Sequence, residues 1–271
     1  MGNASAPEVA EMYDSPEGQL GPILFGGHLH WGYWDQASAD ADFATAAERL
    51  TKLMIDTTGI GAGQKFIDLG CGVGLAARKL AQVRQCRVEG ITISRFQQQS
   101  ASAQALAAGM QDQVSFMHGS ALDVPRPDQT YDGGWFFESI FHMDHRAALH
   151  EASRLLKPGA LLSLTDLPLL PGTTDEFKAF AQQHIHSSFI SLEAYPALLA
   201  ETGFELVAIN DITANVMPWL VPKFRETLER HHQQIQDTVP GITEKTIDDW
   251  IYLFEYMSEN LGYIILTARK R

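Results

Sequence analysis

The chain is poor in cysteine and contains no long apolar run. Its 271 residues include only two cysteines, Cys71 and Cys86, and neither has a second cysteine near it in the sequence. Isolated cysteines form neither a disulfide framework nor the paired spacing of a zinc site, so we expect no metal and a reducing, cytoplasmic setting. No apolar stretch reaches membrane-spanning length, and the first residues lack the basic and hydrophobic regions of a signal peptide.

Basic residues are also scarce relative to acidic ones. The 20 Lys and Arg stand against 33 Asp and Glu, which gives a formal net charge of -13. This charge repels nucleic-acid phosphates and anionic membrane surfaces, so we expect neither as a partner. Hydrophobic residues make up 45% of the chain, which is enough for one large core. We therefore predict a single domain over residues 1–271.

Glycine, by contrast, is concentrated in one informative segment, Phe66 to Gly74. An apolar strand carries Asp68 to its end, and Gly70, Gly72 and Gly74 then alternate before an expected helix. Glycine permits a sharp turn there and lets a ligand approach the main chain closely. The segment predicts a nucleotide-shaped site with a carboxylate in its floor.

Two cofactors compete for this motif. Gly72, Gly74 and Ala77 satisfy the glycine pattern of dinucleotide-binding folds, and Glu89 follows at the distance of a ribose-binding acid. An anionic pyrophosphate would have Asp68 as a poor neighbour, however. S-adenosylmethionine brings a sulfonium and an ammonium, which a carboxylate attracts. The motif therefore favours S-adenosylmethionine over NAD, and a purely structural strand-turn-helix stays open.

Apolar strands and helices alternate from residue 43 onward. The expected helices cover 43–57, 75–82, 95–108 and about 144–155. The first expected strand begins at Phe66, and the other six cover 86–93, 114–118, 131–137, 160–165, 204–213 and 262–270. This pattern predicts an α/β fold, Rossmann-like, with a seven-stranded, mostly parallel sheet flanked by helices. Ligands of such sheets bind beyond the carboxyl ends of the strands. The polar residues expected in that crevice are Asp68, Ser94, Ser120, Glu138 and Asp166.

Three segments outside this alternation are predicted to be helical additions. They are an N-terminal cap over about 1–58 and inserts over about 168–200 and 214–260. We expect the inserts to serve as a lid, since methyl transfer benefits from excluding water and orienting the acceptor. A plain packing role is the alternative.

Motifs spread along nearly the whole chain resemble those of class I S-adenosylmethionine-dependent methyltransferases that act on small molecules. The segments that carry the resemblance are Val9-Ala10-Glu11-Met12-Tyr13, His28-Leu29-His30-Trp31-Gly32-Tyr33-Trp34, Asp68-Leu69-Gly70-Cys71-Gly72-Val73-Gly74, Gly90-Ile91-Thr92-Ile93-Ser94-Arg95-Phe96-Gln97, Glu138-Ser139-Ile140-Phe141-His142-Met143 and Leu156-Lys157-Pro158-Gly159. The pattern is most similar to bacterial sugar O-methyltransferases of antibiotic glycosides, of the rebeccamycin type. Tocopherol-type and terpenoid C-methyltransferases are more distant.

The resemblance implies a set of cofactor-binding residues. The three alternate glycines would approach the methionine and ribose parts of S-adenosylmethionine, with Asp68 near the amino end. Many class I enzymes grip the ribose with an acid that this chain lacks, and Glu89 is expected to point out of its strand. The other implied cofactor residues are Tyr33, Thr92, Ile93, Ser94, Gln97, Ser120, Ala121 and Phe137. Ser120 alternatively acts as a cap or turn residue, and Trp31 and Trp34 alternatively pack a loop onto the core.

The same resemblance implies His142 as a general base oriented by Asp166, because relatives use a histidine and an aspartate in this way. Phe141 replaces a second histidine found in sugar-methylating relatives, which shifts the expected acceptor toward apolar or aromatic molecules. We predict an enzyme of specialised metabolism that O-methylates a small molecule. C- or N-methylation of an apolar or prenylated acceptor is the alternative. NAD-dependent oxidoreduction and a non-catalytic scaffold lie outside the class, and a homodimer stays open.

Overall fold

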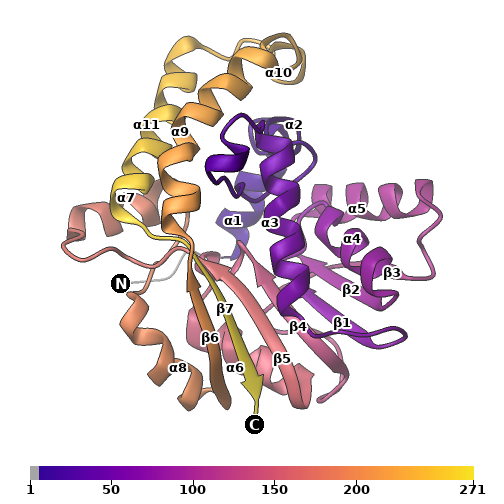
Figure 1. Ribbon diagram of the computed structural model, residues 1–271. Coiled ribbons are helices and arrows are strands. Elements are labelled where there is room, and N and C mark those ends of the chain that lie inside the picture. The colour runs from indigo at the N-terminus through magenta and orange to yellow at the C-terminus, as the bar shows by residue number, and fades with distance from the viewer. Residues whose placement is uncertain (1–5) are drawn as a thin grey trace.

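The computed structural model describes residues 6–271 and is organised around one seven-stranded sheet (Figure 1). The strands are β1 (Lys65–Leu69), β2 (Arg87–Thr92), β3 (Val114–His118), β4 (Tyr131–Phe137), β5 (Leu156–Asp166), β6 (Phe204–Asp211) and β7 (Ile264–Lys270), in the order β3-β2-β1-β4-β5-β7-β6. Strand β7 runs antiparallel to the other six strands, which all run in the same direction. The predicted seven-stranded, mostly parallel sheet is confirmed.

The order in which the chain adds strands to the sheet reverses between β1 and β4. From β1 the chain moves outward to β2 and β3, and it then returns to pair β4 with the other side of β1. Such a switch point leaves a crevice beyond the carboxyl ends of the two central strands, because their connections leave in opposite directions. The glycine-rich segment follows β1 directly and therefore lies in this crevice.

Helices cover both faces of the sheet and its carboxyl-end edge. They are α1 (Ala6–Asp14), α2 (Gly21–Leu24), α3 (Phe43–Thr57), α4 (Leu75–Arg84), α5 (Arg95–Ala107), α6 (His145–Leu155), α7 (Asp175–His184), α8 (Tyr195–Glu201), α9 (Thr213–Arg230), α10 (His232–Thr238) and α11 (Glu244–Asn260). Helices α3, α4 and α5 lie on one face, and α6 and α8 lie on the other (Figure 1). The four helices predicted between residues 43 and 155 are all present.

Strand alternation divides the core into two layers. In β4, Trp135 and Phe137 pack on the side of α3, α4 and α5, whereas Phe136 packs on the side of α6 and α8. All three aromatic side chains are buried. Because successive side chains of a strand point to opposite faces, this aromatic run supplies both layers.

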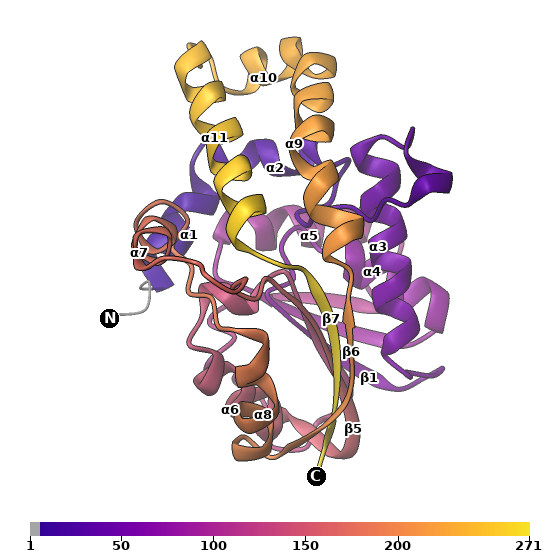
Figure 2. The same ribbon diagram turned by 60° about the vertical axis from the view of Figure 1, so that its left-hand side comes forward.

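The insert predicted over 214–260 is helical and stands above the carboxyl ends of the strands. Figures 1 and 2 show α9 and α11 side by side, with α10 joining them at their far end. Phe224, Leu228 and Ile251 from this pair pack with Leu24 of α2 in a separate apolar cluster. The segment 168–200 divides instead, because α8 packs on the sheet beside β6. Residues 1–5 of the predicted N-terminal cap lie outside the described residues.

Candidate active site

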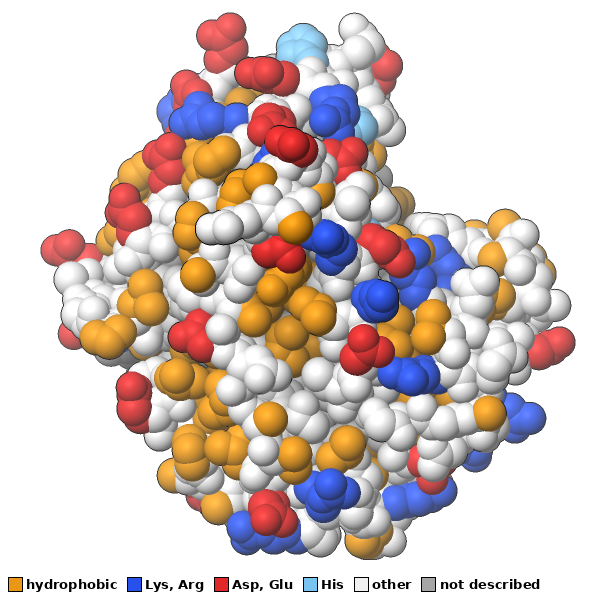
Figure 3. Space-filling model, in the orientation of Figure 1, with side chains coloured by type: hydrophobic (Ala, Val, Ile, Leu, Met, Phe, Trp, Pro, Cys, Tyr) orange, Lys and Arg blue, Asp and Glu red, His pale blue; other side chains and the backbone are white. Residues whose placement is uncertain are grey.

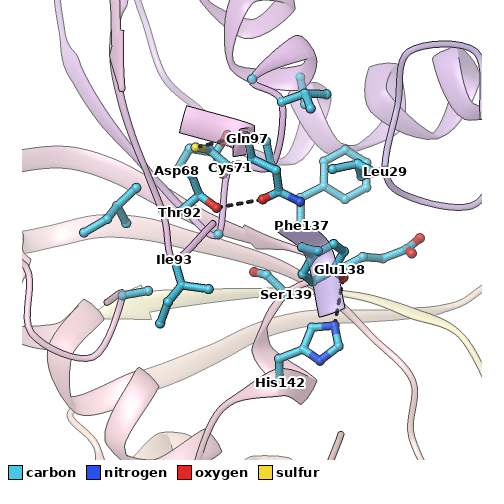
Figure 4. Close-up of a pocket in the computed structure, with 18 of the residues that line it drawn as sticks. Leu29, Asp68, Cys71, Thr92, Ile93, Gln97, Phe137, Glu138, Ser139 and His142 are labelled. Carbon is cyan, nitrogen blue, oxygen red and sulfur yellow. Dashed lines mark hydrogen bonds between the residues drawn. The ribbon is translucent and has the colours of Figure 1, made fainter. Parts of the chain in front are cut away.

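A cavity of about 190 Å³ lies at the switch point, beyond the ends of β1, β2 and β4. Most of the predicted cofactor residues line it, and Figure 4 shows several of them around its walls. The predicted residues in the lining are Asp68, Gly70, Gly72, Gly74, Thr92, Ile93, Gln97, Ser120, Ala121, Phe137 and His142. The topology thus brings together residues that are spread over more than 70 positions of the chain.

The three alternate glycines all adopt left-handed backbone conformations. Their φ angles are +94° at Gly70, +53° at Gly72 and +72° at Gly74, which side chains disfavour. A Cβ atom added to Gly72 would lie 2.7 Å from Cδ1 of Leu29, which faces it across the cavity. Glycine is therefore required here both for the turn and to keep the cavity open.

Asp68 is a buried carboxyl group with an unsatisfied oxygen. Its Oδ1 has no hydrogen-bond partner among the described residues, and the residue is 1% exposed. Burial raises the pKa of the Asp68 carboxyl to about 7. An orphaned carboxylate in a cavity wall favours a bound cation, because unpaired burial is costly and an opposite charge offsets it. The ammonium of S-adenosylmethionine fits this requirement.

Beside the end of β2, a hydroxyl and an amide face the same cavity. The Thr92 hydroxyl donates a 2.7 Å hydrogen bond to Oε1 of Gln97, and both residues are buried (Figure 4). These neutral groups occupy the place of the acid that many class I enzymes use. A hydroxyl and an amide can hydrogen-bond a ribose diol.

Two predicted cofactor residues lie outside the cavity lining. Ser94 is the N-cap of α5. Its hydroxyl oxygen accepts a hydrogen bond from the backbone N–H of Gln97, and its hydroxyl donates one to the Asp14 carboxylate. Capping turns this side chain toward the helix and α1. Tyr33 packs against the core beside α3 and donates its amide to the Ala46 carbonyl. Trp34 is fully buried and serves as packing, so neither aromatic ring reaches the cofactor cavity.

Glu89 points away from the cavity, as expected. It accepts hydrogen bonds from the Arg126 guanidinium, including one of 3.0 Å from Nε, and a further bond from the Tyr131 hydroxyl. These bonds hold the pKa of Glu89 below its usual range, although burial alone would raise it. A carboxylate engaged in this way is not available for a dinucleotide ribose.

His142 projects from a short 3-10 helix, Ile140–His142, into the cavity. Its Nε2 lies 3.0 Å from the hydroxyl of Tyr13, and its Nδ1 lies 3.2 Å from the carbonyl oxygen of His186. A carbonyl only accepts, so Nδ1 carries the proton and Nε2 presents its lone pair. Burial lowers the pKa of His142 to about 4, so the imidazole is neutral at pH 7.

The predicted pairing of Asp166 with His142 is wrong. Nε2 of His145 donates a 2.7 Å hydrogen bond to Asp166, and the Tyr195 hydroxyl donates another. Asp166 follows Leu162 and Leu164 on the face of β5 that α6 and α8 cover. Strand alternation therefore turns its side chain away from the cavity, whose lining does not include it.

Glu138 is a site residue that the sequence placed in the crevice without a role. Its backbone is left-handed, with a φ of 48°, a strained conformation for a side-chain-bearing residue. The carboxyl group accepts a 2.8 Å hydrogen bond from the Trp31 amide and another from the Tyr263 hydroxyl. Burial raises the pKa of Glu138 to about 8. The sequence signal that could have identified it is an acid directly after the fourth strand, since the backbone strain is visible only in the structure.

Helix α1 closes the cavity from above through its last two residues. Tyr13 contacts His142 on one side, and Asp14 accepts from the Ser94 hydroxyl and the Phe96 amide on the other. Val9 of the same helix also lines the cavity. The two contacts bridge the ends of β4 and β2, so α1 covers part of the cavity.

A second cavity of about 350 Å³ adjoins the first. Tyr13, Leu29, Glu138 and His142 line both, so the two cavities meet at these four residues.

Among residues 6–271, no group of His, Cys, Asp and Glu is arranged to hold a metal ion. None of the helices in that range combines the length and apolarity that crossing a bilayer requires.

Comparison with known proteins supports a methyltransferase site. Residues 66–159 match the family model described as a methyltransferase domain. The (+)-O-methylkolavelool synthase of Herpetosiphon aurantiacus is 32% identical over 99% of this chain and 96% of its own. The 27-O-demethylrifamycin SV methyltransferase of Amycolatopsis mediterranei is also 32% identical, over 97% of each chain. The solved (4+2)-cyclase SpnF has a TM-score of 0.84 and 29% identity, over 99% of this chain and 97% of its own.

Replacing Gly72 with valine should weaken binding of S-adenosylhomocysteine by at least about tenfold. The added side chain would collide with Leu29 across the cavity and would strain a left-handed backbone. Isothermal titration calorimetry measures the change. Gly63→Val is the matched control, because Gly63 has a φ of +74° and nothing within 4 Å of an added Cβ. Equal affinity for both variants would place the cofactor elsewhere.

Affinity for S-adenosylhomocysteine should rise as the pH increases from about 6 to about 8. The pKa of Asp68 is raised to about 7, so the group is neutral below that pH and attracts an ammonium only above it. The Asp68→Asn variant should bind more weakly and without this pH dependence. Titrations of both proteins at several pH values provide the measurement, and parallel profiles would contradict the role given to Asp68.

Proposed function

Because the chain belongs to the class I S-adenosylmethionine-dependent small-molecule methyltransferases, we propose that it transfers a methyl group to a hydroxyl of a specialised metabolite in bacteria, with His142 as general base. The observation that carries this proposal is the position of His142 at the junction of the two cavities. Its uncharged imidazole faces the place where a cofactor methyl group and an acceptor would meet.

S-adenosylmethionine, the methyl donor of the family, supplies an electrophilic methyl group when bound. Asp68 would hold the amino end of the cofactor, and the glycine turn would admit its methionine and ribose parts. His142 would receive the acceptor's hydroxyl proton at Nε2 as the new carbon–oxygen bond forms and the methyl carbon–sulfur bond breaks, which leaves S-adenosylhomocysteine as the second product. The His186 carbonyl and the Ser187 hydroxyl, 3.2 Å from Nδ1, fix the ring for this task.

Tyr13, which contacts Nε2, and Glu138, which lines both cavities, are neutral polar groups at this junction. Burial raises the pKa of Tyr13, so its hydroxyl stays protonated and donates to Nε2 until an acceptor competes for it. Glu138 has its pKa raised to about 8 and is mainly protonated at pH 7. Closure by α1 would keep water from the cofactor, which favours transfer over hydrolysis.

C-methylation of an apolar acceptor is the second candidate. Aromatic rings of Trp31, Phe141 and Phe254 line the adjoining cavity, and such faces can stabilise a developing carbocation. Because the similar chain SpnF is described as a cyclase, transfer itself must be measured as release of S-adenosylhomocysteine together with the mass of the product.

A small molecule, and not a nucleic acid, is the partner that the charge supports. Acidic and basic side chains are intermingled over the face in Figure 3, and the whole chain carries a formal net charge of -13.

Cys71 and Cys86 are both buried free thiols, which supports a cytoplasmic setting.

His142→Ala should slow methyl transfer by about a hundredfold or more, since this is the usual contribution of a general base. Affinity for S-adenosylhomocysteine should stay within about twofold, because Asp68 and the glycine turn remain intact. Stopped assays with a hydroxyl acceptor and calorimetry give the two quantities.

His145→Asn is the matched control for that variant. It loses the hydrogen bond to Asp166 and should lower the melting temperature, yet leave the turnover number within about threefold. Turnover lost in His145→Asn and kept in His142→Ala would reverse the assignment of the base.

A further inference from the structure

The second cavity has walls from both ends of the chain. Met12 of α1 and Leu24 of α2 form one side, and Phe224 of α9 and a stripe of α11 form another. The α11 stripe is Trp250, Leu253, Phe254 and Met257. Its spacing of three, four and seven residues places these side chains on one helix face.

Aromatic rings make this cavity strongly apolar. The Phe254 ring lies 4.4 Å from the Phe224 ring and 6.0 Å from Trp31, measured between ring centroids. Phe25 closes the same corner, with its ring 6.5 Å from that of Phe254. These rings pack against one another and form a continuous apolar wall. A hydrocarbon body that lies against this wall would lose part of its water-exposed surface, which is the main source of affinity for apolar ligands.

The cavity wall offers no Lys or Arg to an anionic acceptor. None of its described lining residues is of either type, Glu17 is acidic, and Glu138 is mainly protonated at pH 7. A diphosphate or carboxylate would enter without a counterion, and burying an unpaired charge is strongly unfavourable. Glu17 is exposed at the surface and Glu138 lies at the junction with the cofactor cavity.

Three polar groups able to hold a hydroxyl lie at that junction. They are Tyr13, Glu138 and His142, while the walls formed by α2, α9 and α11 are apolar. The other polar lining residues lie outside α2, α9 and α11 and are Ser15, Glu17, His184 and Ser187. A sugar would need several hydrogen-bond partners along its length, and an alcohol needs them only at one end. The shape and chemistry of the cavity therefore call for a molecule with one polar end.

We propose that the acceptor is a neutral lipophilic alcohol, with its hydroxyl at His142 and its hydrocarbon body against the surface formed by Phe25, Phe224 and the α11 stripe. This inference rests on the proposed O-methylation and adds to it the substrate class. The cavity of about 350 Å³ lies within the range of pockets that hold drug-sized ligands. An isoprenoid alcohol has the required chemistry.

Binding tests the substrate class separately from turnover. Protein saturated with S-adenosylhomocysteine is titrated with farnesol, farnesyl diphosphate and n-octyl glucoside. Farnesol should bind at least about tenfold more tightly than farnesyl diphosphate, because the diphosphate has no counterion in the cavity. The glucoside should bind more weakly than farnesol, since its sugar would leave most of its hydroxyls unpaired.

Three variants locate the binding site. Phe254→Ala should weaken farnesol binding by about tenfold through lost apolar contact. Tyr252→Ala, on the same helix but 56% exposed and outside the cavity lining, should leave it within about twofold. Leu253→Lys should reverse the preference toward farnesyl diphosphate, because it introduces the missing cation. Melting temperature and S-adenosylhomocysteine affinity verify that each variant is folded.

The outcomes separate this inference from the proposed function. Tight farnesol binding that depends on Phe254 but yields no methyl ether supports the substrate class and contradicts O-methylation. Preferred binding of farnesyl diphosphate or the glucoside by the unmodified protein overturns the substrate class, whether or not hydroxyls are methylated. Equal effects of Phe254→Ala and Tyr252→Ala overturn the placement of the hydrocarbon body.

Discussion

The candidate site depends on the burial of one carboxyl group, Asp68, at the end of a central strand. Its Oδ1 finds no partner among the described residues, and the left-handed glycines that follow leave open space beside it. A folded protein tolerates such a group when a ligand completes its interactions or when it takes up a proton. The raised pKa of Asp68 favours uptake of a proton when no ligand is bound, and the amino end of S-adenosylmethionine would complete its interactions when the cofactor is bound.

A second constraint is that two chemically different cavities meet at one small set of side chains. The cofactor cavity is lined by the glycine turn, Asp68 and aliphatic side chains, and the adjoining one mainly by aromatic and large apolar side chains. Tyr13, Glu138 and His142 stand between them. Because both His142 and Glu138 are held in their neutral forms by burial, the junction can handle a hydroxyl proton without presenting a permanent charge to an apolar molecule. Helix α1 contacts both the proposed base and the cofactor side of the site, since Tyr13 contacts His142 and Asp14 contacts the start of α5.

Much of the fold and of the cofactor wall could be predicted because their signals are local. The glycine turn, the strand ends and the helices from residue 43 to 155 appear where periodicity and turn chemistry place them. Glu89 also points outward as expected. Predictions failed where a side chain had two directions available. Asp166 turns to His145 because of strand alternation, and Ser94 turns to its own helix as a cap. Tyr33 stays in the core, because the loop that carries it packs against α3.

The sequence by itself determined the sheet, the glycine turn and the type of cofactor, since each follows from the order of residues within a short segment. Only the tertiary structure decided which groups surround His142 and which surfaces form the acceptor cavity. Tyr13 lies 129 positions from His142, and the α11 stripe lies still farther along the chain from α1 and α2. No local pattern encodes such contacts, because they arise from the way α2, α9 and α11 pack together above the sheet and share a cavity with α1.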